Sequence, residues 1–271
     1  MSKRQHEHSA MSSSPGERSR PAQRQAEIAE HVLQHGSVAA ADLAEMFHVS
    51  LMTIHRDLDE LERQGVVRKY RGGVSSQPSS VFESNVAYRM RSSTAEKRAI
   101  ARHARELIEP GMAIMLDDST TTLELAKLLT DITPLTVVTN FLETIKLLSA
   151  VPGIRLMALG GEYYPTHDSF LGVPCIEAIE AIRVDLLFTS TSAVSGEFAY
   201  HQEQEIVLVK RAMMRSAQRS ILLVDHTKLR RVALHRHAHV TDFDRIITDA
   251  KATESELADL TEHGARSVVA D

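Results

Sequence analysis

From about residue 81 onward, short apolar runs alternate with stretches of helical periodicity, and this alternation restricts the fold of the 271-residue chain most strongly. Short apolar runs bounded by polar turns are typical of buried strands, and helices between successive strands are typical of βαβ units. We expect seven strands, at residues 113–116, 135–138, 155–159, 185–188, 220–224, 244–247 and 267–270. We expect six helices beside them, at residues 95–108, 121–130, 141–150, 174–182, 204–217 and 255–263. The pattern predicts an α/β domain with a mostly parallel sheet.

The residues before this region have a different pattern. Residues 1–22 are polar and rich in serine, which is typical of a disordered tail. Residues 23–74 form a compact block of short helices followed by a strand-like segment, which predicts a small α+β domain. Residues 75–92 contain the polar run QPSS and are expected to be a linker. The α/β domain then occupies residues 93–271.

Composition excludes several classes of protein. No apolar run approaches the ~20 residues of a membrane span, and the N-terminus has no apolar stretch typical of a secretory signal. Cys175 is the single cysteine, so an intramolecular disulfide is impossible, and a cytoplasmic protein is expected. The formal net charge is −5, so any binding of nucleic acid must use a local basic patch.

The N-terminal block has the pattern of a helix-turn-helix. Ile54, Leu58 and Leu61 are spaced so that they form one apolar stripe, and Ser50 is a favourable N-cap for the helix that carries them. A tight connection precedes Ser50, as this motif requires. The three expected helices span residues 23–35, 40–47 and 50–64.

The face opposite this stripe carries groups suited to DNA. Side chains near the N-terminus of the third helix would meet the bases, and basic residues after the helix would form a wing that contacts phosphates. Acidic residues farther along the helix would confine contact to its first turns. The alternative is a three-helix module for protein contacts. The candidate DNA-binding residues are Ser50, Met52, Thr53, His55, Arg56, Arg68, Lys69 and Arg71.

These motifs resemble the DeoR family of bacterial transcriptional regulators. Residues 43–58, LAEMFHVSLMTIHRDL, and the later RGG turn at 71–73 are similar to the family signature of a winged helix-turn-helix. The resemblance implies a regulator, with a repressor as the preferred form, that binds double-stranded operator DNA. His55 stands where the family has an arginine, which implies an altered operator sequence or weaker phosphate anchoring.

A run of hydroxyl residues follows the first expected strand of the α/β domain. Hydroxyls and unpaired backbone N–H groups at a helix N-terminus favour an anion, and a preceding carboxylate can accept bonds from sugar hydroxyls. The position at the carboxyl end of a strand is also where α/β proteins bind ligands. The alternative is that Asp118 or Ser119 only caps the helix. The candidate residues are Asp117, Asp118, Ser119, Thr120, Thr121 and Thr122.

The resemblance to the family continues through nearly all of the second domain, beginning with EKRAIA at residues 96–101. It implies a sensor of phosphorylated sugars with a fold similar to ribose-5-phosphate isomerase and coenzyme A transferases. The family usually has glycine at the position of Ser119, so the type of ligand is in question. Further effector-binding residues implied by the resemblance are Thr139, Asn140, Gly160, Gly161, Lys210, Asp225 and Lys228. Lys210 and Lys228 would neutralise phosphate; the alternative for Asp225 and Lys228 is a local turn pair.

An enzyme and a metal-binding protein are two other interpretations of these residues. A sugar-phosphate isomerase or coenzyme A transferase would use Asp117, Asp118 and Lys210 in catalysis, but a DNA-binding module makes catalysis unnecessary, so we expect no enzyme and no cofactor. Three alternating histidines, His235, His237 and His239, could bind a metal ion, yet no acidic or cysteine partner is near in sequence, so no metal site is expected.

A single short recognition helix reads only a half-site, which predicts a homodimer or homotetramer.

Overall fold

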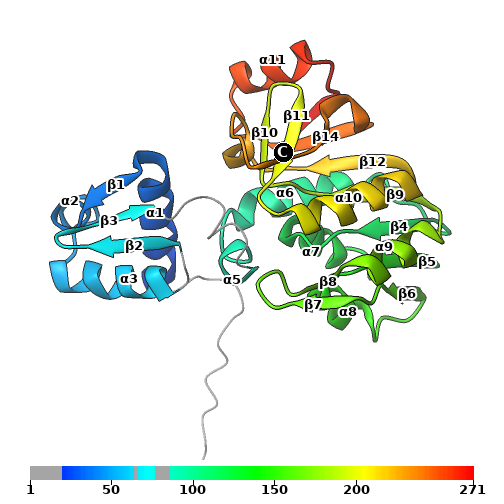
Figure 1. Ribbon diagram of the computed structural model, residues 1–271, viewed down its shortest axis with the longest axis horizontal. Helices are drawn as coiled ribbons and strands as arrows, with labels where there is room; N and C mark the ends of the chain where they lie inside the picture. The colour runs from blue at the N-terminus through cyan, green and yellow to red at the C-terminus, as the bar shows by residue number, and fades with distance from the viewer. Residues whose placement is uncertain (1–19, 64–65, 77–85) are drawn as a thin grey trace, which may run out of the picture.

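The computed structural model describes residues 20–63, 66–76 and 86–271. They form a small N-terminal domain and a larger α/β domain (Figure 1). The predicted tail lies outside the described residues except for 20–22, which belong to the first helix. The segment predicted as a linker contains the end of a strand and a short helix, and residues 77–85 between them lie outside the described residues.

The N-terminal domain packs three helices against a small antiparallel sheet, in the strand order β1-β3-β2. The three helices confirm the predicted helix-turn-helix and the hairpin confirms the wing, whereas β1 was not predicted. The elements are α1 (Arg20–His35), β1 (Ser37–Ala39), α2 (Ala40–Met46), α3 (Leu51–Arg63), β2 (Val67–Tyr70) and β3 (Gly73–Ser76).

An apolar core holds this domain together. Ile54, Leu58 and Leu61 of α3 are buried, as their spacing predicts, and they pack with residues of α1, α2 and the hairpin. Asp57 is buried beside this stripe, where its carboxylate accepts hydrogen bonds from Arg24 at 2.6 Å and from Gln25 at 2.9 Å. The acidic side chain therefore fastens α3 to α1 and does not face solvent where it would repel DNA.

The α/β domain is built on a seven-stranded sheet with the order β15-β14-β12-β9-β4-β5-β6. Every pairing within it is parallel, which confirms the predicted fold class. All seven strands overlap the predicted segments. They are β4 (Ala113–Leu116), β5 (Leu135–Thr139), β6 (Ile154–Ala158), β9 (Val184–Thr189), β12 (Ala217–Leu223), β14 (Arg245–Asp249) and β15 (Ser267–Ala270).

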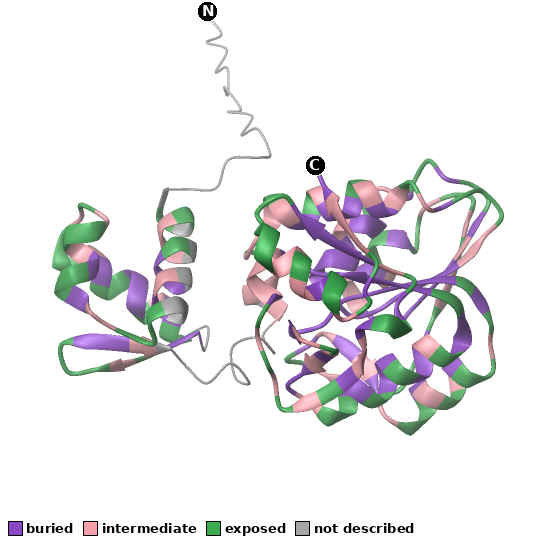
Figure 2. Ribbon diagram, turned by 90° about the horizontal axis from the view of Figure 1, so that it is seen from above, coloured by how far each residue is buried: buried purple, intermediate pink, exposed green. Residues whose placement is uncertain are grey.

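Helices cover both faces of this sheet. One apolar cluster packs α6 and α7 against one face, and another packs α9 and α10 against the other. In Figure 2 the buried strands run between helices whose outer faces are exposed. The helices are α6 (Thr94–Arg105), α7 (Thr120–Ala126), α8 (Leu142–Leu148), α9 (Val173–Glu180), α10 (Gln204–Ser216) and α11 (Glu254–Glu262).

Several short elements were not predicted. A hairpin of two strands follows β6, and a three-stranded antiparallel sheet with the order β10-β11-β13 packs beside the main sheet. A single-turn helix, α5, precedes α6. The additional elements are α5 (Val86–Arg89), β7 (Glu162–Tyr164), β8 (Ser169–Leu171), β10 (Ala193–Ser195), β11 (Phe198–His201), β13 (His235–His239) and the short 3-10 turns η1 (His226–Lys228) and η2 (Val240–Asp242). None of the described helices is both long enough and apolar enough to cross a membrane.

Candidate functional site

The strand order places a topological switch point between β4 and β9. From β4 the chain proceeds through β5 and β6 toward one edge, and from β9 through β12, β14 and β15 toward the other. Loops leaving the carboxyl ends of neighbouring strands diverge at such a point and leave a crevice for a ligand. The hydroxyl run after β4 begins at this point, where a crevice of this kind is expected.

Asp117, the first residue after β4, is the centre of the hydrogen-bond network in the crevice and is fully buried. Its Oδ1 accepts from the backbone N–H of Ser119 and the hydroxyl of Thr122, both at 3.1 Å. Its Oδ2 accepts from the hydroxyl of Thr189 and the N–H of Ser190, both at 2.7 Å, and from the ammonium of Lys210. Asp117 therefore ties the loops after β4 and β9 to α10.

Lys210 reaches both aspartates of the loop. Its ammonium lies 3.5 Å from Oδ1 of Asp118 in addition to its bond with Asp117, and all three side chains are buried. Burial alone would raise the pKa of Asp118, but the positive charges of Lys210, His167 and Arg89 and the hydroxyl of Ser169 hold it below its usual value. One ammonium thus lies between two carboxylates, and Asp118, the one farther from it, is the candidate acceptor for a ligand hydroxyl.

Ser119 caps the helix that follows these aspartates, which is the alternative role considered for it. The N–H of Thr122 donates to Oγ of Ser119 at 3.1 Å. The hydroxyl of Thr122 points inward and donates to the carbonyl oxygens of Asp117 and Ser119. Thr120 and Thr121 are buried beside them, and the hydroxyl of Thr120 donates to the carbonyl of Arg89 at 3.3 Å. Ser119 and Thr122 therefore shape the loop, whereas Thr121 is a candidate for contact with a ligand.

The residues after β5 and β6 lie along the same carboxyl edge. Thr139 accepts from the N–H of Phe141 at 3.1 Å, and the amide of Asn140 donates to the carbonyl of Phe170 at 3.0 Å. The other amide atom, Oδ1 of Asn140, is buried without a hydrogen-bond partner. Asn140 therefore holds β8 while keeping one acceptor for a ligand.

Gly160 and Gly161 connect β6 to the β7–β8 hairpin. A Cβ on Gly161 would overlap the carbonyl oxygen of Leu171, and its φ of 151° is unfavourable for other residues. Gly160 has open space around its α-carbon. Gly161 is therefore required for the close turn into the hairpin, so any contact with a ligand would be a second role for it.

On the other side of β9, Asp225 follows β12. Its Oδ1 accepts from the N–H of Thr227 at 3.1 Å and from the hydroxyl of the same residue, so it caps the turn that contains Lys228. Asp225 therefore has a local role in this turn, through Thr227. Lys228 is half-buried on this turn, and both residues lie close enough to Lys97 to act on its pKa.

Four residues that the sequence did not single out also surround the crevice. His167 is buried and bonds through Nε2 to the carboxylate of Glu203 at 2.9 Å. His201 packs near it, with ring centroids 6.3 Å apart, and burial and the neighbouring cation Lys210 push its pKa well below 6.5. Arg89 approaches from α5. These residues come from segments without a recognisable motif, so only the folded chain shows that they belong together.

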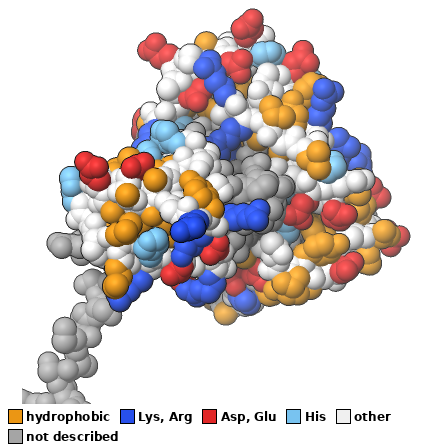
Figure 3. Space-filling model, turned by 60° about the vertical axis from the view of Figure 1, so that its left-hand side comes forward, with side chains coloured by type: hydrophobic (Ala, Val, Ile, Leu, Met, Phe, Trp, Pro, Cys, Tyr) orange, Lys and Arg blue, Asp and Glu red, His pale blue; other side chains and the backbone are white. Residues whose placement is uncertain are grey.

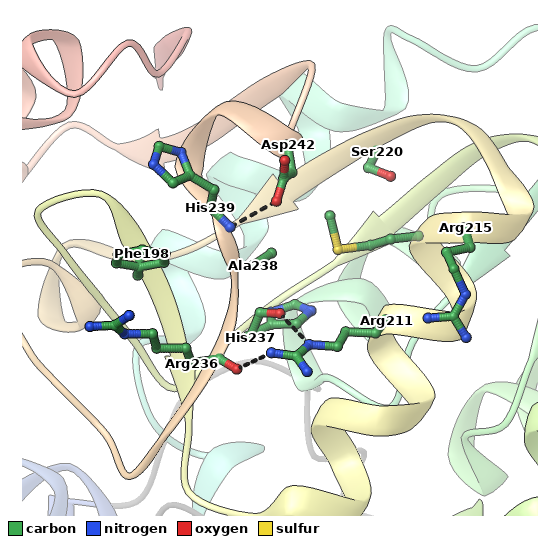
Figure 4. A pocket seen from close by; sticks show the side chains of 10 residues that line it. Phe198, Arg211, Arg215, Ser220, Arg236, His237, Ala238, His239 and Asp242 are labelled. Carbon is green, nitrogen blue, oxygen red and sulfur yellow. Dashed lines mark hydrogen bonds between the residues drawn. The ribbon is translucent and has the colours of Figure 1, made fainter.

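A separate cavity of about 590 Å³ lies between α10, β12 and β13 (Figure 4). Arg211 in its wall holds β13, since its guanidinium donates to the carbonyls of Arg236 and His237 at 2.8 and 2.9 Å. Arg236 itself stacks over the ring of Phe198 at 4.4 Å. Burial lowers the pKa of His237 to about 3, so its ring is neutral. We assign this cavity a structural role.

The three alternating histidines lie on β13, with His237 buried and His235 and His239 half-buried. Among the described residues, no group of three or more His, Cys, Asp or Glu side chains is arranged to hold a metal ion. The buried ring of His237 packs against Phe243, with centroids 6.0 Å apart. The histidines therefore belong to the packing of β13.

In the N-terminal domain, the predicted contact residues of α3 lie on its exposed side. Ser50 caps the helix, since its Oγ accepts from the N–H of Thr53 at 3.2 Å. Met52, His55 and Arg56 are exposed, and Met52 exposes 67% of its surface. Such an apolar side chain beside an arginine is suited to a groove that offers thymine methyl groups and guanine edges.

The wing needs both of its glycines. Gly72 has a φ of 91°, and a Cβ on Gly73 would lie 2.7 Å from the carbonyl oxygen of Val38. The sharp turn leaves Arg68 and Arg71 exposed. Two basic side chains therefore extend from the hairpin next to α3.

Lys69 has a different environment from the arginines of the wing. Its ammonium pairs with Asp59, and its N–H donates to Glu62 at 2.8 Å. The residue joins the wing to α3, so contact with a phosphate would require it to leave Asp59. Figure 3 shows basic, acidic and apolar side chains interspersed on this domain.

Comparisons with known proteins agree with this division into two domains. The model of the DeoR-like helix-turn-helix domain matches residues 24–80, and that of the DeoR C terminal sensor domain matches residues 92–250. The chain is 32% identical to the glycerol-3-phosphate regulon repressor of Escherichia coli strain K12, covering 89% of this chain and 96% of the relative. It is 30% identical to the transcriptional repressor GlcR of Bacillus subtilis, covering 82% and 86%.

Solved structures match the chain at low similarity. Ribose 5-phosphate isomerase A from Methanocaldococcus jannaschii is 18% identical with a TM-score of 0.37, covering 53% of this chain and 56% of that chain. The translation initiation factor eIF-2B of Pyrococcus horikoshii is 10% identical with a TM-score of 0.44, covering 83% and 87%.

Proposed function

Because the chain belongs to the DeoR family of helix-turn-helix transcriptional regulators, we propose that it represses carbohydrate or related metabolic genes in response to a phosphorylated sugar. The chain is a DNA-binding regulator and not an enzyme, since the family match covers both domains. The interpretation as an isomerase or coenzyme A transferase is therefore set aside. Relatives named as repressors of a glycerol-3-phosphate regulon and as GlcR support the proposed link to sugar metabolism.

One observation carries the choice of ligand: the crevice at the switch point combines carboxylates, hydroxyls and cations. Asp118 and Asn140 offer acceptors that suit the hydroxyls of a sugar. Lys210 and Arg89 provide positive charge at the same edge, which suits a phosphate. Thr121 supplies a buried hydroxyl between these two regions. A ligand with both hydroxyls and an anionic group uses all of them.

On DNA, we propose that α3 enters the major groove and that the wing follows the phosphate backbone. The exposed Arg56 reads a base edge, while Arg68 and Arg71 contact phosphates. One such unit covers a half-site, so the active species is a homodimer or homotetramer on a two-fold operator. The protein acts in the cytoplasm, where both DNA and sugar phosphates are found.

The test begins with the operator. Duplexes selected from a random library on the full-length protein, followed by fluorescence anisotropy, identify a sequence bound at least 10³-fold more tightly than unrelated DNA. The complex is then titrated with glycerol 3-phosphate, ribose 5-phosphate and glucose 6-phosphate. Release of the operator by one ester supports the proposal, whereas equal affinity for all DNA sequences contradicts its first step.

A further inference from the structure

The short helix α5 is attached to the effector loop through both the backbone and the side chain of Arg89. The guanidinium donates to the carbonyl of Asp118 at 3.3 Å and lies 3.5 Å from Nδ1 of His167. The carbonyl of Arg89 accepts from the hydroxyl of Thr120 at 3.3 Å. This residue therefore touches the loop at two points, although it precedes that loop by about 30 residues in the chain.

Two further contacts join α5 to the α/β domain. The buried ammonium of Lys97 donates to the carbonyl of Arg89 and, at 2.7 Å, to that of Ser92. At the other end of α5, the N–H of Val86 donates to the carbonyl of Thr166 at 3.0 Å. The guanidinium of Arg89 is thus presented to the crevice from an anchored turn.

The same helix also contacts the DNA-binding domain. Tyr88, the neighbour of Arg89, is half-buried and packs against the apolar core of the N-terminal domain, together with Phe47 and Val49. Figure 1 shows α5 on the side of the α/β domain that faces the smaller domain. Two adjacent residues therefore face the effector loop and the DNA-binding domain.

We propose that Arg89 binds the anionic group of the effector and that α5 transmits this event to the DNA-binding domain through Tyr88. The inference rests on the proposed function, since it concerns the same crevice and the same ligand class. The guanidinium faces the carbonyl of Asp118 and the imidazole of His167 in the loops around the crevice. A phosphate offers charge-assisted and bidentate bonds, so Arg89 turns toward the ligand when it binds.

The movement of Arg89 toward the ligand changes what Tyr88 can contact. An effector alters DNA affinity only if the effector-bound and effector-free states differ in their interactions. Arg89 and Tyr88 are neighbours on one helical turn, so a movement of Arg89 changes the contacts of Tyr88. When Arg89 moves to the phosphate, its bonds to the loop are exchanged and the docking of Tyr88 shifts with it. The coupling thus needs no contact between the effector and the DNA-binding domain.

The first test measures effector affinity by calorimetry for full-length wild type, Arg89→Met, Arg89→Lys and the control Arg91→Met. The probe is whichever of glycerol 3-phosphate, ribose 5-phosphate or glucose 6-phosphate binds wild type. Arg89→Met is expected to weaken binding roughly 10- to 100-fold, as for loss of bonds to a charged group. Arg89→Lys retains the charge and loses less. Arg91→Met, which removes a charge from an exposed residue two positions away, changes affinity less than twofold.

The second test uses Tyr88→Ala, with operator affinity measured with and without the same ester. We expect effector affinity within twofold of wild type, while the effector-induced change in operator affinity falls from a typical 5- to 150-fold to below twofold. If wild type binds none of the three esters, the proposed function fails and the inference with it. If wild type binds but Arg89→Met and Arg89→Lys bind equally well, or Tyr88→Ala responds fully, only the inference is overturned.

Discussion

At the scale of single residues, Asp117 shows how folding changes the role that a sequence suggests. Its position after a strand predicts an acceptor for sugar hydroxyls, yet both carboxylate oxygens are occupied by Ser119, Thr122, Thr189 and Lys210, among others. The carboxylate organises the crevice. We expect contact with the effector from buried residues around it, such as Thr121.

Replacing Thr121 with valine keeps the volume of this buried side chain but deletes its hydroxyl. We expect the change to weaken effector binding by about 1.5–3 kcal/mol, the usual value for a hydrogen bond to a charged group. Thr144→Val is the matched control, because the hydroxyl of Thr144 is buried without a partner and lies on α8. Calorimetry with the active ester measures both, and equal affinities for the two variants remove Thr121 from the site.

Lys97 is expected to make the stability of the protein depend on pH. Burial lowers the pKa of its ammonium from 10.5 to about 7, so between these values the unfolded chain binds more protons than the folded one. The free energy of unfolding therefore rises with pH through this window, and the cost of the buried charge is fully present below pH 7. Relative to that of Lys97→Met, the free energy of unfolding of wild type rises by up to ~1.4 kcal/mol per pH unit.

Urea unfolding at pH 7, 8 and 9 measures this difference. Lys127→Met serves as the control, because Lys127 is exposed and pairs only with Glu124 at the surface among the contacts described for it. Parallel pH profiles for wild type and Lys97→Met would contradict the account of Lys97.

At the scale of elements, we expect α3 to contact the bases of the DNA and the wing to contact its phosphates. The first turns of α3 carry exposed groups suited to bases, while the hairpin carries Arg68 and Arg71. The far end of α3 is acidic, and Arg63 there pairs with Glu60. We therefore expect base contact only from the N-terminal half of the helix.

Two arginine substitutions separate these roles. Arg56→Ala should weaken binding of the selected operator by roughly 1–3 kcal/mol while leaving unrelated DNA nearly unaffected. Arg71→Ala should weaken all sequences alike and reduce the slope of log affinity against log salt by about 1. Anisotropy from low to moderate salt distinguishes them, with Arg63→Ala as the control. Wild-type binding by both variants would show that the docking model is wrong.

The elements that the sequence predicted are those with strong local patterns. The strands of the main sheet are apolar on both faces, and α3 has a continuous stripe ending at Leu61, so each was recognisable in isolation. The short strands β7, β8, β10 and β11 have three or four residues, too few for a recognisable alternation, and they pair as two hairpins, with β13 joining β11 from farther along the chain. The crevice shows the same limit. Asp117 and Lys210 come from recognisable motifs, whereas His167 and His201 gain their place only through packing.

At the scale of the whole molecule, two domains with separate cores are joined by a segment that reaches both. The parallel sheet fixes the crevice, and the smaller domain has its own apolar core around α3. A single copy of that domain contacts only a few base pairs, too few for specificity in a genome. We therefore expect specific binding to need the assembly of at least two copies.

Sedimentation of the full-length protein should give a dimer or larger assembly. The fragment of residues 1–76 should bind the operator far more weakly, because it lacks the sensor domain through which the copies associate. A monomeric fragment with the affinity of the whole protein would contradict this expectation.

The most direct test of the central claim is the affinity of wild type for its selected operator, measured while phosphorylated sugars and their unphosphorylated parents are titrated. We predict that one ester changes the affinity 5- to 150-fold, that its parent sugar has far less effect at the same concentration, and that Thr121→Val requires more of the ester. An operator affinity that no ester alters, or that the parent sugar alters equally, would contradict the account.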